Sequence, residues 1–211
     1  MIWSPFRGRG RDRVEGLALS ELTREFVALD LETTGLDPRS DAIVAAAAIR
    51  FVDGEPVDGL VTLVNPERPI PADATRVHGI GDDAVSGAPS VGEVLPTLER
   101  VCGGRVVVGH GLDFDLAVID RARRAAGLPA LRLTTLDTRR LAAVLHRDWS
   151  DYGLDAVAAR LGVPVEGRHT AEGDAIAAGR ILTALVPRLQ ARSIETVAEA
   201  AWLQRQVVFE R

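Results

Sequence analysis

The segment FVALDLETTG, residues 26–35, constrains the fold of this chain more than any other stretch. Its first four residues are apolar, which predicts a buried strand, and two acids then follow at Asp30 and Glu32. Side chains alternate between the two faces of a strand, so residues two positions apart point the same way. Neighbouring carboxylates repel each other in a poorly solvated site, and a bound cation would remove that repulsion. The alternative is that the strand ends at Leu31 and both acids are solvated.

Length and composition indicate one domain. The 211 residues suffice for a core of a sheet and packed helices, and the 46% of apolar residues predict a soluble globule. The single cysteine, Cys102, allows no internal disulfide and no cysteine-based zinc site. The net charge of -5 argues against a large non-specific nucleic-acid surface. The sequence shows no signal peptide and no apolar run long enough to span a bilayer, so we expect a cytoplasmic protein without a membrane partner.

The order of apolar runs and turns predicts an α/β fold, with three antiparallel strands followed by helices that alternate with short strands. Strands are expected over residues 25–31, 42–52, 60–64, 105–110 and 133–138, with a turn over 53–59 and a long connection over 65–90. Helices are expected over residues 17–24, 91–101, 112–126, 138–145, 153–161, 171–190 and 194–204. The domain organisation predicted is a flexible N-terminal arm at 1–16, one domain at 17–190, and a C-terminal helix and tail at 191–211.

Two later stretches repeat the combination of an apolar element and an acid. In VGHGLDFDL, Asp115 comes just past a buried strand, near the start of a helix and beside its apolar stripe. In HTAEGD, Asp174 lies beside the buried face of a helix, and His169 comes just before that helix. Each of these residues alone has a simpler interpretation as a helix-terminal or capping group. An acid beside a core, however, costs free energy unless it is paired or bound to a metal.

Together these stretches supply four carboxylates, each at a strand end or a helix start. Carboxylate oxygens select hard cations such as Mg²⁺ or Mn²⁺. Four such ligands suit a site of two metal ions roughly 4 Å apart, which is the arrangement that clamps the attacking and leaving oxygens of a phosphodiester. The four candidate metal ligands are Asp30, Glu32, Asp115 and Asp174.

With three motifs in this order, the chain resembles the DEDDh 3′–5′ exonuclease superfamily, and in particular the epsilon-like proofreading exonucleases of bacterial DNA polymerase III. The motifs are ALDLETTGL, VGHGLDFDL and HTAEGD, and VHGI, LDT and YGLDAVAARLGV fall between them in the family's order. The resemblance covers roughly residues 25–187. One position departs from the family pattern, because Gly111 stands where the family usually has asparagine.

The resemblance implies a ribonuclease H-like fold, a mixed five-stranded sheet flanked by helices. It implies that the four acids hold two Mg²⁺ or Mn²⁺ ions, that His169 is the general base, and that nucleoside 5′-monophosphates are released from the 3′ end of DNA in proofreading or repair. The expected partners are single-stranded 3′ ends, DNA rather than RNA, and a DNA polymerase. Candidate substrate-binding residues, each with a simpler structural role as the alternative, are Thr33, Thr34, Gly35, His78 and Phe114.

Two other functions stay open at this point. The first is an exonuclease that acts on RNA or short oligonucleotides, because the motifs do not show whether the site accepts a sugar with a 2′-hydroxyl group. The second is a non-catalytic subunit that only docks on a polymerase, and the complete set of four acids and His169 argues against it. The sequence leaves the oligomeric state undetermined.

Overall fold

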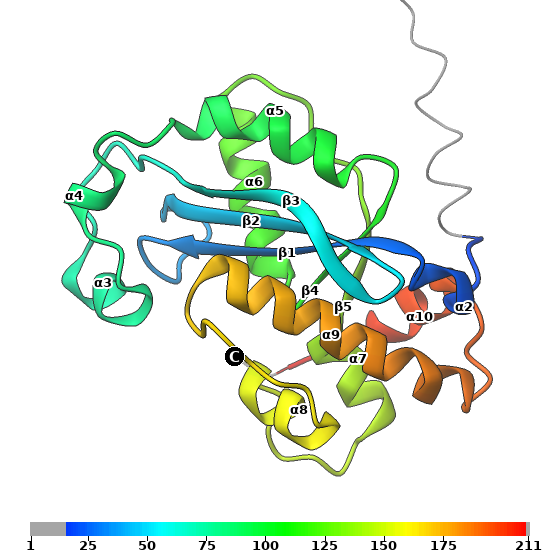
Figure 1. The fold of residues 1–211 in the computed structure, drawn as a ribbon. Helices are drawn as coiled ribbons and strands as arrows, with labels where there is room; N and C mark the ends of the chain where they lie inside the picture. The colour runs from blue at the N-terminus through cyan, green and yellow to red at the C-terminus, as the bar shows by residue number, and fades with distance from the viewer. Residues whose placement is uncertain (1–15, 210–211) are drawn as a thin grey trace, which may run out of the picture.

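Five strands form one mixed sheet in the computed structural model, which describes residues 16–209. They are β1 Glu25–Thr33, β2 Ile43–Val52, β3 Glu55–Leu63, β4 Val106–Gly109 and β5 Thr134–Asp137. Their order across the sheet is β3-β2-β1-β4-β5 (Figure 1). The strands β1, β2 and β3 are antiparallel, whereas β4 and β5 run parallel to β1. The mixed α/β sheet predicted from the sequence is confirmed.

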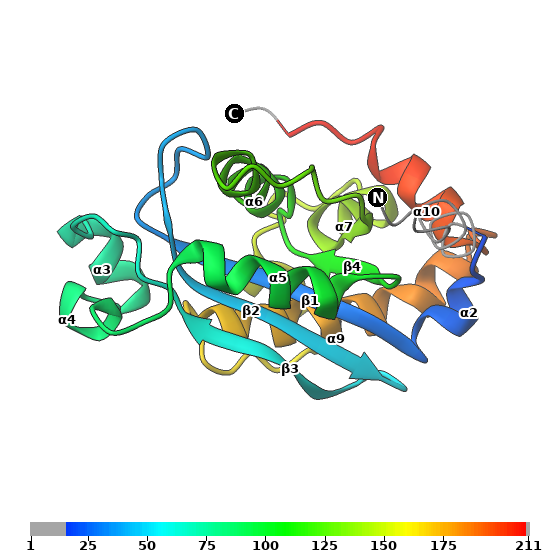
Figure 2. The same ribbon diagram turned by 90° about the horizontal axis from the view of Figure 1, so that it is seen from above.

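Helices cover both faces of this sheet. They are α2 Leu19–Leu22, α3 Ala72–His78, α4 Asp82–Val85, α5 Val91–Cys102, α6 Asp113–Ala125, α7 Thr138–Leu145, α8 Leu154–Leu161, α9 Ala171–Gln190 and α10 Val197–Gln204. One core lies between the sheet and α5 and α6, and a larger one lies between the sheet and α9, with α7, α8 and α10 around it (Figure 2). Alternation along β1 divides its side chains between them, so Phe26 and Ala28 face α9 while Val27 and Leu29 face the other core.

The helices predicted from the sequence are confirmed, with ends that differ by a few residues. The α5 helix begins after Ser90, whose backbone N–H donates to the Glu93 carboxylate at 2.8 Å, as expected for the predicted capping box. The carboxylate of Asp137 caps α7 by accepting from the backbone of Arg139. The first helix is shorter than predicted, since α2 has only one turn. None of the helices in the described range is long and apolar enough to cross a membrane.

Two predictions about the connections are wrong. The reversal between β2 and β3 needs only Asp53 and Gly54, both at positive φ, so most of the expected turn over 53–59 is strand. Pro56 is part of this strand because β3 lies at the sheet edge, where a proline is tolerated. The expected connection over 65–90 contains α3 and α4, and it packs against Val44 of β2 through Ile70, just before α3, and Val85 of α4 (Figure 1).

The C-terminal helix belongs to the same core as the rest of the described chain. Val197 and Ala200 of α10 are fully buried in the cluster that also contains α9. The backbone N–H of Val197 donates to the carbonyl of Leu17, which ties α10 to the segment just before α2. The predicted flexible arm at 1–16 lies outside the described residues except for Gly16.

Candidate active site

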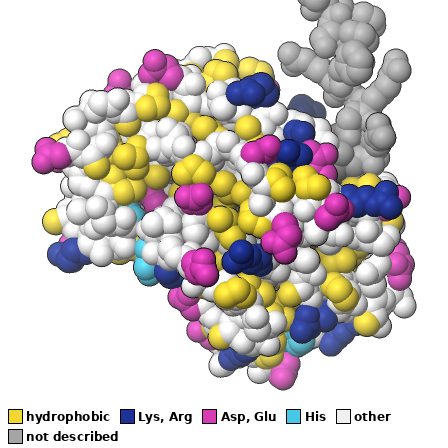
Figure 3. Space-filling model, viewed as in Figure 1, with side chains coloured by type: hydrophobic (Ala, Val, Ile, Leu, Met, Phe, Trp, Pro, Cys, Tyr) yellow, Lys and Arg dark blue, Asp and Glu magenta, His cyan; other side chains and the backbone are white. Residues whose placement is uncertain are grey.

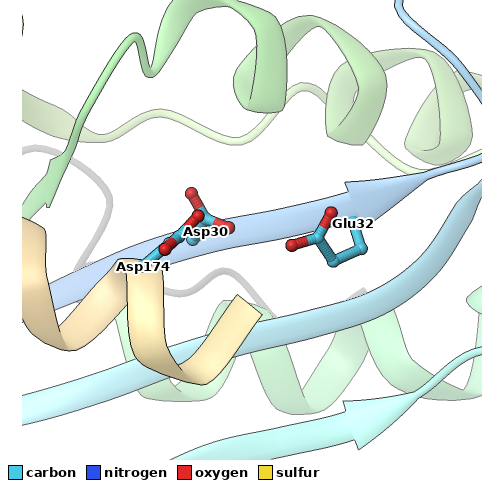
Figure 4. A group of neighbouring side chains, drawn as sticks. All are labelled: Asp30, Glu32 and Asp174. Atoms are coloured by element: carbon cyan, nitrogen blue, oxygen red, sulfur yellow. The ribbon is translucent and has the colours of Figure 1, made fainter. Parts of the chain in front are cut away.

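The two acids of the opening segment lie on one face of β1. The strand runs through to Thr33, so the alternative that it ends at Leu31 is wrong. Asp30 and Glu32 therefore point to the α9 side of the sheet, where Asp174 comes from the first turn of α9 (Figure 4). Each of these three side chains offers a carboxylate oxygen, and the three oxygens lie within 4.8 Å of one another. We call Asp30, Glu32 and Asp174 the carboxylate group.

The fourth predicted acid lies next to this group. β4 pairs with β1 only at Val27 and Ala28, so the Leu31 N–H further along is left without a partner from β4. That N–H donates to Oδ1 of Asp115 at 3.1 Å, and the Asp115 side chain is buried against the strand. The short β4 strand thus explains how an acid from α6 reaches the end of β1.

Burial and mutual repulsion make these carboxylates weak acids. Burial, reinforced by the charges of Asp115, Asp174 and Glu32, raises the pKa of Asp30 well above its usual value. Burial also raises the pKa of Glu32 to about 7 and that of Asp115 to about 8. One oxygen of Asp174 is buried and accepts no hydrogen bond from any described residue. Hard oxygen donors that repel one another and lack partners suit a divalent cation such as Mg²⁺ or Mn²⁺, so these residues fit the implied metal.

These raised pKa values predict how stability depends on pH when EDTA removes all metal. In the unfolded chain carboxyl groups titrate near pH 4. Between that pH and the folded pKa values of Glu32 and Asp115 these two groups bind more protons in the fold than in the unfolded chain, so their contribution to stability falls as the pH rises. Burial lowers the pKa of His78, His110 and His146, which acts in the opposite direction, so the comparison is made with a variant that keeps these histidines. From about pH 5 to about pH 8 in EDTA we expect the melting temperature of the wild type to fall relative to that of Glu32→Gln. Mn²⁺ should raise the wild-type melting temperature more at the higher pH, because the metal binds the deprotonated form. A difference between the two melting temperatures that stays constant through this range in EDTA would contradict the prediction.

A tight turn places His169 at the start of α9. Its backbone has the left-handed conformation, with φ of 61°, and its side chain is exposed. Thr170 caps α9, because its hydroxyl oxygen accepts the N–H of Gly173 at 3.1 Å. Nδ1 of the imidazole lies 3.4 Å from Nη1 of Arg168. Nη1 of Arg168 also pairs with Asp174, so the imidazole is one side chain away from the carboxylate group.

Gly173 permits this turn to approach the helix, and we predict that Gly173→Ala is destabilising. A Cβ there would lie 2.1 Å from the carbonyl oxygen of Gly167, so the turn would have to move. We expect a loss of about 1–3 kcal/mol in the free energy of unfolding, measured by urea denaturation, because overpacking strains the backbone. The matched control is Gly92→Ala in the first turn of α5, where the nearest atom is 3.9 Å away. It should be neutral or stabilising, and equal losses for both variants would contradict the argument.

The segment after Glu32 forms a tightly bonded loop. A β-bulge follows Glu32, and the Thr33 hydroxyl donates to the carbonyl of Gly35 at 2.6 Å. The Thr34 hydroxyl donates to Asp41 at 3.0 Å, so it is engaged within the loop. A Cβ on Gly35 would lie 2.6 Å from the Asp41 carboxylate, which explains the glycine. Thr33 and Gly35 thus border the carboxylate group, while the Thr34 side chain holds the loop together.

The other two candidate substrate residues lie on two different helices, α3 and α6. His78 ends α3, its Nδ1 accepts the N–H of Ile80 at 3.0 Å, and burial lowers its pKa. Its Nε2 is buried without a partner in the described chain. Phe114 is half-buried and lines a groove that also includes Leu36 and Arg139. Figure 3 shows histidine, acidic and basic side chains around the hollow between α3 and α8.

Several residues of this region were not predicted from the sequence. Arg168 forms ion pairs with Asp174 and Asp155. Its position next to His169 in the sequence is the one signal that could have marked it as part of the site. Arg121 on α6 donates to the backbone carbonyls of Pro38 and Asp41 and so holds the β1–β2 loop. Long-range contacts of this kind leave no periodic pattern in the sequence.

Gly111 stands at the turn into α6. Its φ of 81° is left-handed, a conformation that glycine and asparagine both tolerate, which accounts for their exchange at this position. The Gly111 N–H donates to the Asp137 carboxylate at 3.0 Å, so the turn before Asp115 is held without an amide side chain.

A mixed five-stranded sheet with acids gathered at the end of its central strand is the arrangement that the resemblance to exonucleases predicts. The chain belongs to the exonuclease family RNase_T, whose model matches residues 27–182. Membership of this family confirms the resemblance found in the motifs.

Two relatives of the chain are DNA polymerase III proteins. A DNA polymerase III subunit epsilon-like protein of Rhodobacter capsulatus is 42% identical over 193 residues, which are 89% of this chain and 27% of that protein. A PolC-type DNA polymerase III of Caldanaerobacter subterraneus is 35% identical over 186 residues, 88% of this chain and 13% of that protein. The chain thus spans less than a third of the length of these relatives.

Solved structures confirm the predicted ribonuclease H-like fold. Exonuclease X in complex with 5′ overhanging duplex DNA has a TM-score of 0.61 at 24% identity, covering 85% of this chain and 98% of that one. Exonuclease I of E. coli in complex with a dT13 oligonucleotide has a TM-score of 0.68 at 17% identity, covering 80% of this chain and 42% of that one.

Proposed function

We propose that this chain is a metal-dependent 3′–5′ exonuclease that releases nucleoside 5′-monophosphates from the 3′ end of DNA, of the proofreading or repair type. The observation that carries the proposal is the carboxylate group. Three carboxylates from β1 and α9 crowd within 4.8 Å, with Asp115 beside them, and burial raises the pKa of all four. A purely structural role would favour pairing these acids or replacing them by apolar residues.

In this proposal Asp30, Glu32, Asp115 and Asp174 hold two Mg²⁺ or Mn²⁺ ions. The bound ions would supply a more acidic water and would stabilise charge on the leaving 3′ oxygen. His169 accepts the proton of the attacking water, for which its exposed position on a turn beside Asp174 is suited.

The 3′-terminal nucleotide would bind between the β1–β2 loop, α3 and α6. The Thr33–Gly35 backbone borders the carboxylate group, and Thr34 and Asp41 fix its shape. The unpaired Nε2 of His78 would donate to the nucleotide, since its Nδ1 already accepts a backbone N–H. Phe114 would stack on a base from the groove that it lines.

A polymerase partner is proposed only by analogy. The relatives named above are DNA polymerase III proteins, and E. coli Exonuclease I is in complex with a dT13 oligonucleotide. Similarity to these proteins favours single-stranded DNA ends as the substrate and a polymerase as a possible partner.

Digestion of matched oligomers tests this proposal. Single-stranded DNA and RNA of one sequence, labelled at the 5′ end, are incubated with the full chain in Mg²⁺, in Mn²⁺ and in EDTA. We expect a ladder that shortens by one nucleotide at a time on DNA, faster than on RNA, and no cleavage in EDTA. Faster digestion of RNA would move the proposal to an RNA exonuclease, and cleavage in EDTA would refute the metal dependence.

A further inference from the structure

Arg168 places a positive charge against the carboxylate group. Its guanidinium forms an ion pair with Oδ2 of Asp174, a carboxylate whose side chain is only 13% exposed. Its Nε donates to Asp155 on α8 at 2.8 Å, and that carboxylate is largely exposed. One guanidinium therefore joins an acid of the proposed metal site to an acid outside it.

Hydrogen bonds hold the backbone turn that carries Arg168. The residues on either side, Gly167 and His169, both have positive φ, at 62° and 61°. The Gly167 carbonyl accepts from the backbone and the hydroxyl of Thr170, at 3.1 and 2.6 Å. Contact with Asp174 can therefore be lost by movement of the Arg168 side chain toward Asp155, while the turn itself keeps its hydrogen bonds.

A guanidinium and a divalent ion on the same carboxylate weaken each other's binding. Both are cations that would lie within a few ångströms, and they repel strongly in a poorly solvated site. Arg168 binds Oδ2 of Asp174, and Oδ1 is buried without a partner in the described chain. A divalent ion can therefore bind both oxygens of this carboxylate only after Arg168 has left Oδ2.

We propose that Arg168 is a tethered cation that occupies the metal site of the metal-free protein, binding Asp174 in place of a divalent ion and withdrawing to Asp155 when a metal binds. This inference rests on the proposed metal-dependent function. It makes Arg168 a residue that tunes metal affinity and leaves the chemistry to other groups. If Arg168 holds Asp174 in about nine-tenths of the molecules, the apparent metal affinity is about tenfold weaker than the intrinsic one.

Calorimetric titration of the metal-free full chain with Mn²⁺ tests the inference without an activity assay. We expect Arg168→Gln to bind Mn²⁺ about tenfold more tightly than the wild type. Arg168→Lys keeps the charge but loses the planar fork that spans both acids, so it should fall between the two. The control is Arg124→Gln, an exposed arginine near the other end of α6, which should leave affinity unchanged.

A double-mutant cycle separates direct competition from a general effect of charge. Asp155→Asn removes the position to which Arg168 withdraws, so it should weaken Mn²⁺ binding in the wild-type background and have no effect in the Arg168→Gln background. Equal weakening in both backgrounds would overturn the inference in favour of simple electrostatics. Equal affinity of the wild type and Arg168→Gln would also overturn it. A wild type that binds no Mn²⁺ would instead refute the proposed metal-dependent function itself.

Discussion

Asp30→Asn is expected to abolish nuclease activity while leaving the metal-free fold intact or more stable. Asp30 is the most crowded of the four acids, because Asp115, Asp174 and Glu32 all raise its pKa in addition to burial. Removing its charge relieves that repulsion in the absence of metal. It also removes a ligand of the metal ions, which would stabilise the transition state by several kcal/mol. We therefore expect a rate loss of at least about 10³-fold.

Initial rates on single-stranded DNA and melting temperatures in EDTA measure the two effects. Asp148→Asn, the same substitution at an exposed position after α7, serves as the control and should change neither. A large fall in the melting temperature of Asp30→Asn without metal would show that Asp30 has a structural role, and the proposed site would then lose its central ligand.

His169→Ala is expected to lower the rate by about 10²–10⁴-fold, the usual contribution of a positioned general base. His169→Gln should be no faster, because an amide cannot accept the proton of the attacking water. Stability should change little, since the side chain is exposed and its hydrogen-bonding contact in the described chain is with Arg168.

Mn²⁺ affinity distinguishes a base from a metal ligand in these variants. Both should bind Mn²⁺ about as tightly as the wild type, because the imidazole is not expected among the ligands. Near-normal rates in His169→Ala would refute the general-base role. Loss of metal binding together with activity would show that His169 is a ligand instead.

The sequence predicts the helices and the central strands of this fold because their signals are local. Apolar periodicity sets α9 at residues 171–190, where the structure has it, and Asp137 caps α7 as its type and position suggest. The start of β3 could not be predicted in the same way. Gly59 and Pro56 are common in turns, and only pairing with β2 at the edge of the sheet keeps them in a strand.

The geometry of the candidate site is predicted in part. Alternation along β1 suffices to place Asp30 and Glu32 together, and the helix position of Asp174 brings it to the same face. The contact of Asp115 with Leu31 depends on where β4 stops pairing with β1, which no local pattern encodes. The ion pairs of Arg168 depend likewise on how α8 and the turn before α9 pack together.

Anomalous diffraction from crystals of the full chain grown with Mn²⁺ tests the central claim most directly, because it locates the metal independently of activity. The carboxylates that crowd at the end of β1 should hold it. We predict two anomalous peaks roughly 4 Å apart among Asp30, Glu32, Asp115 and Asp174, with the Arg168 guanidinium no longer on Asp174. Crystals with Mn²⁺ in the solution but no peak between these carboxylates would contradict the account.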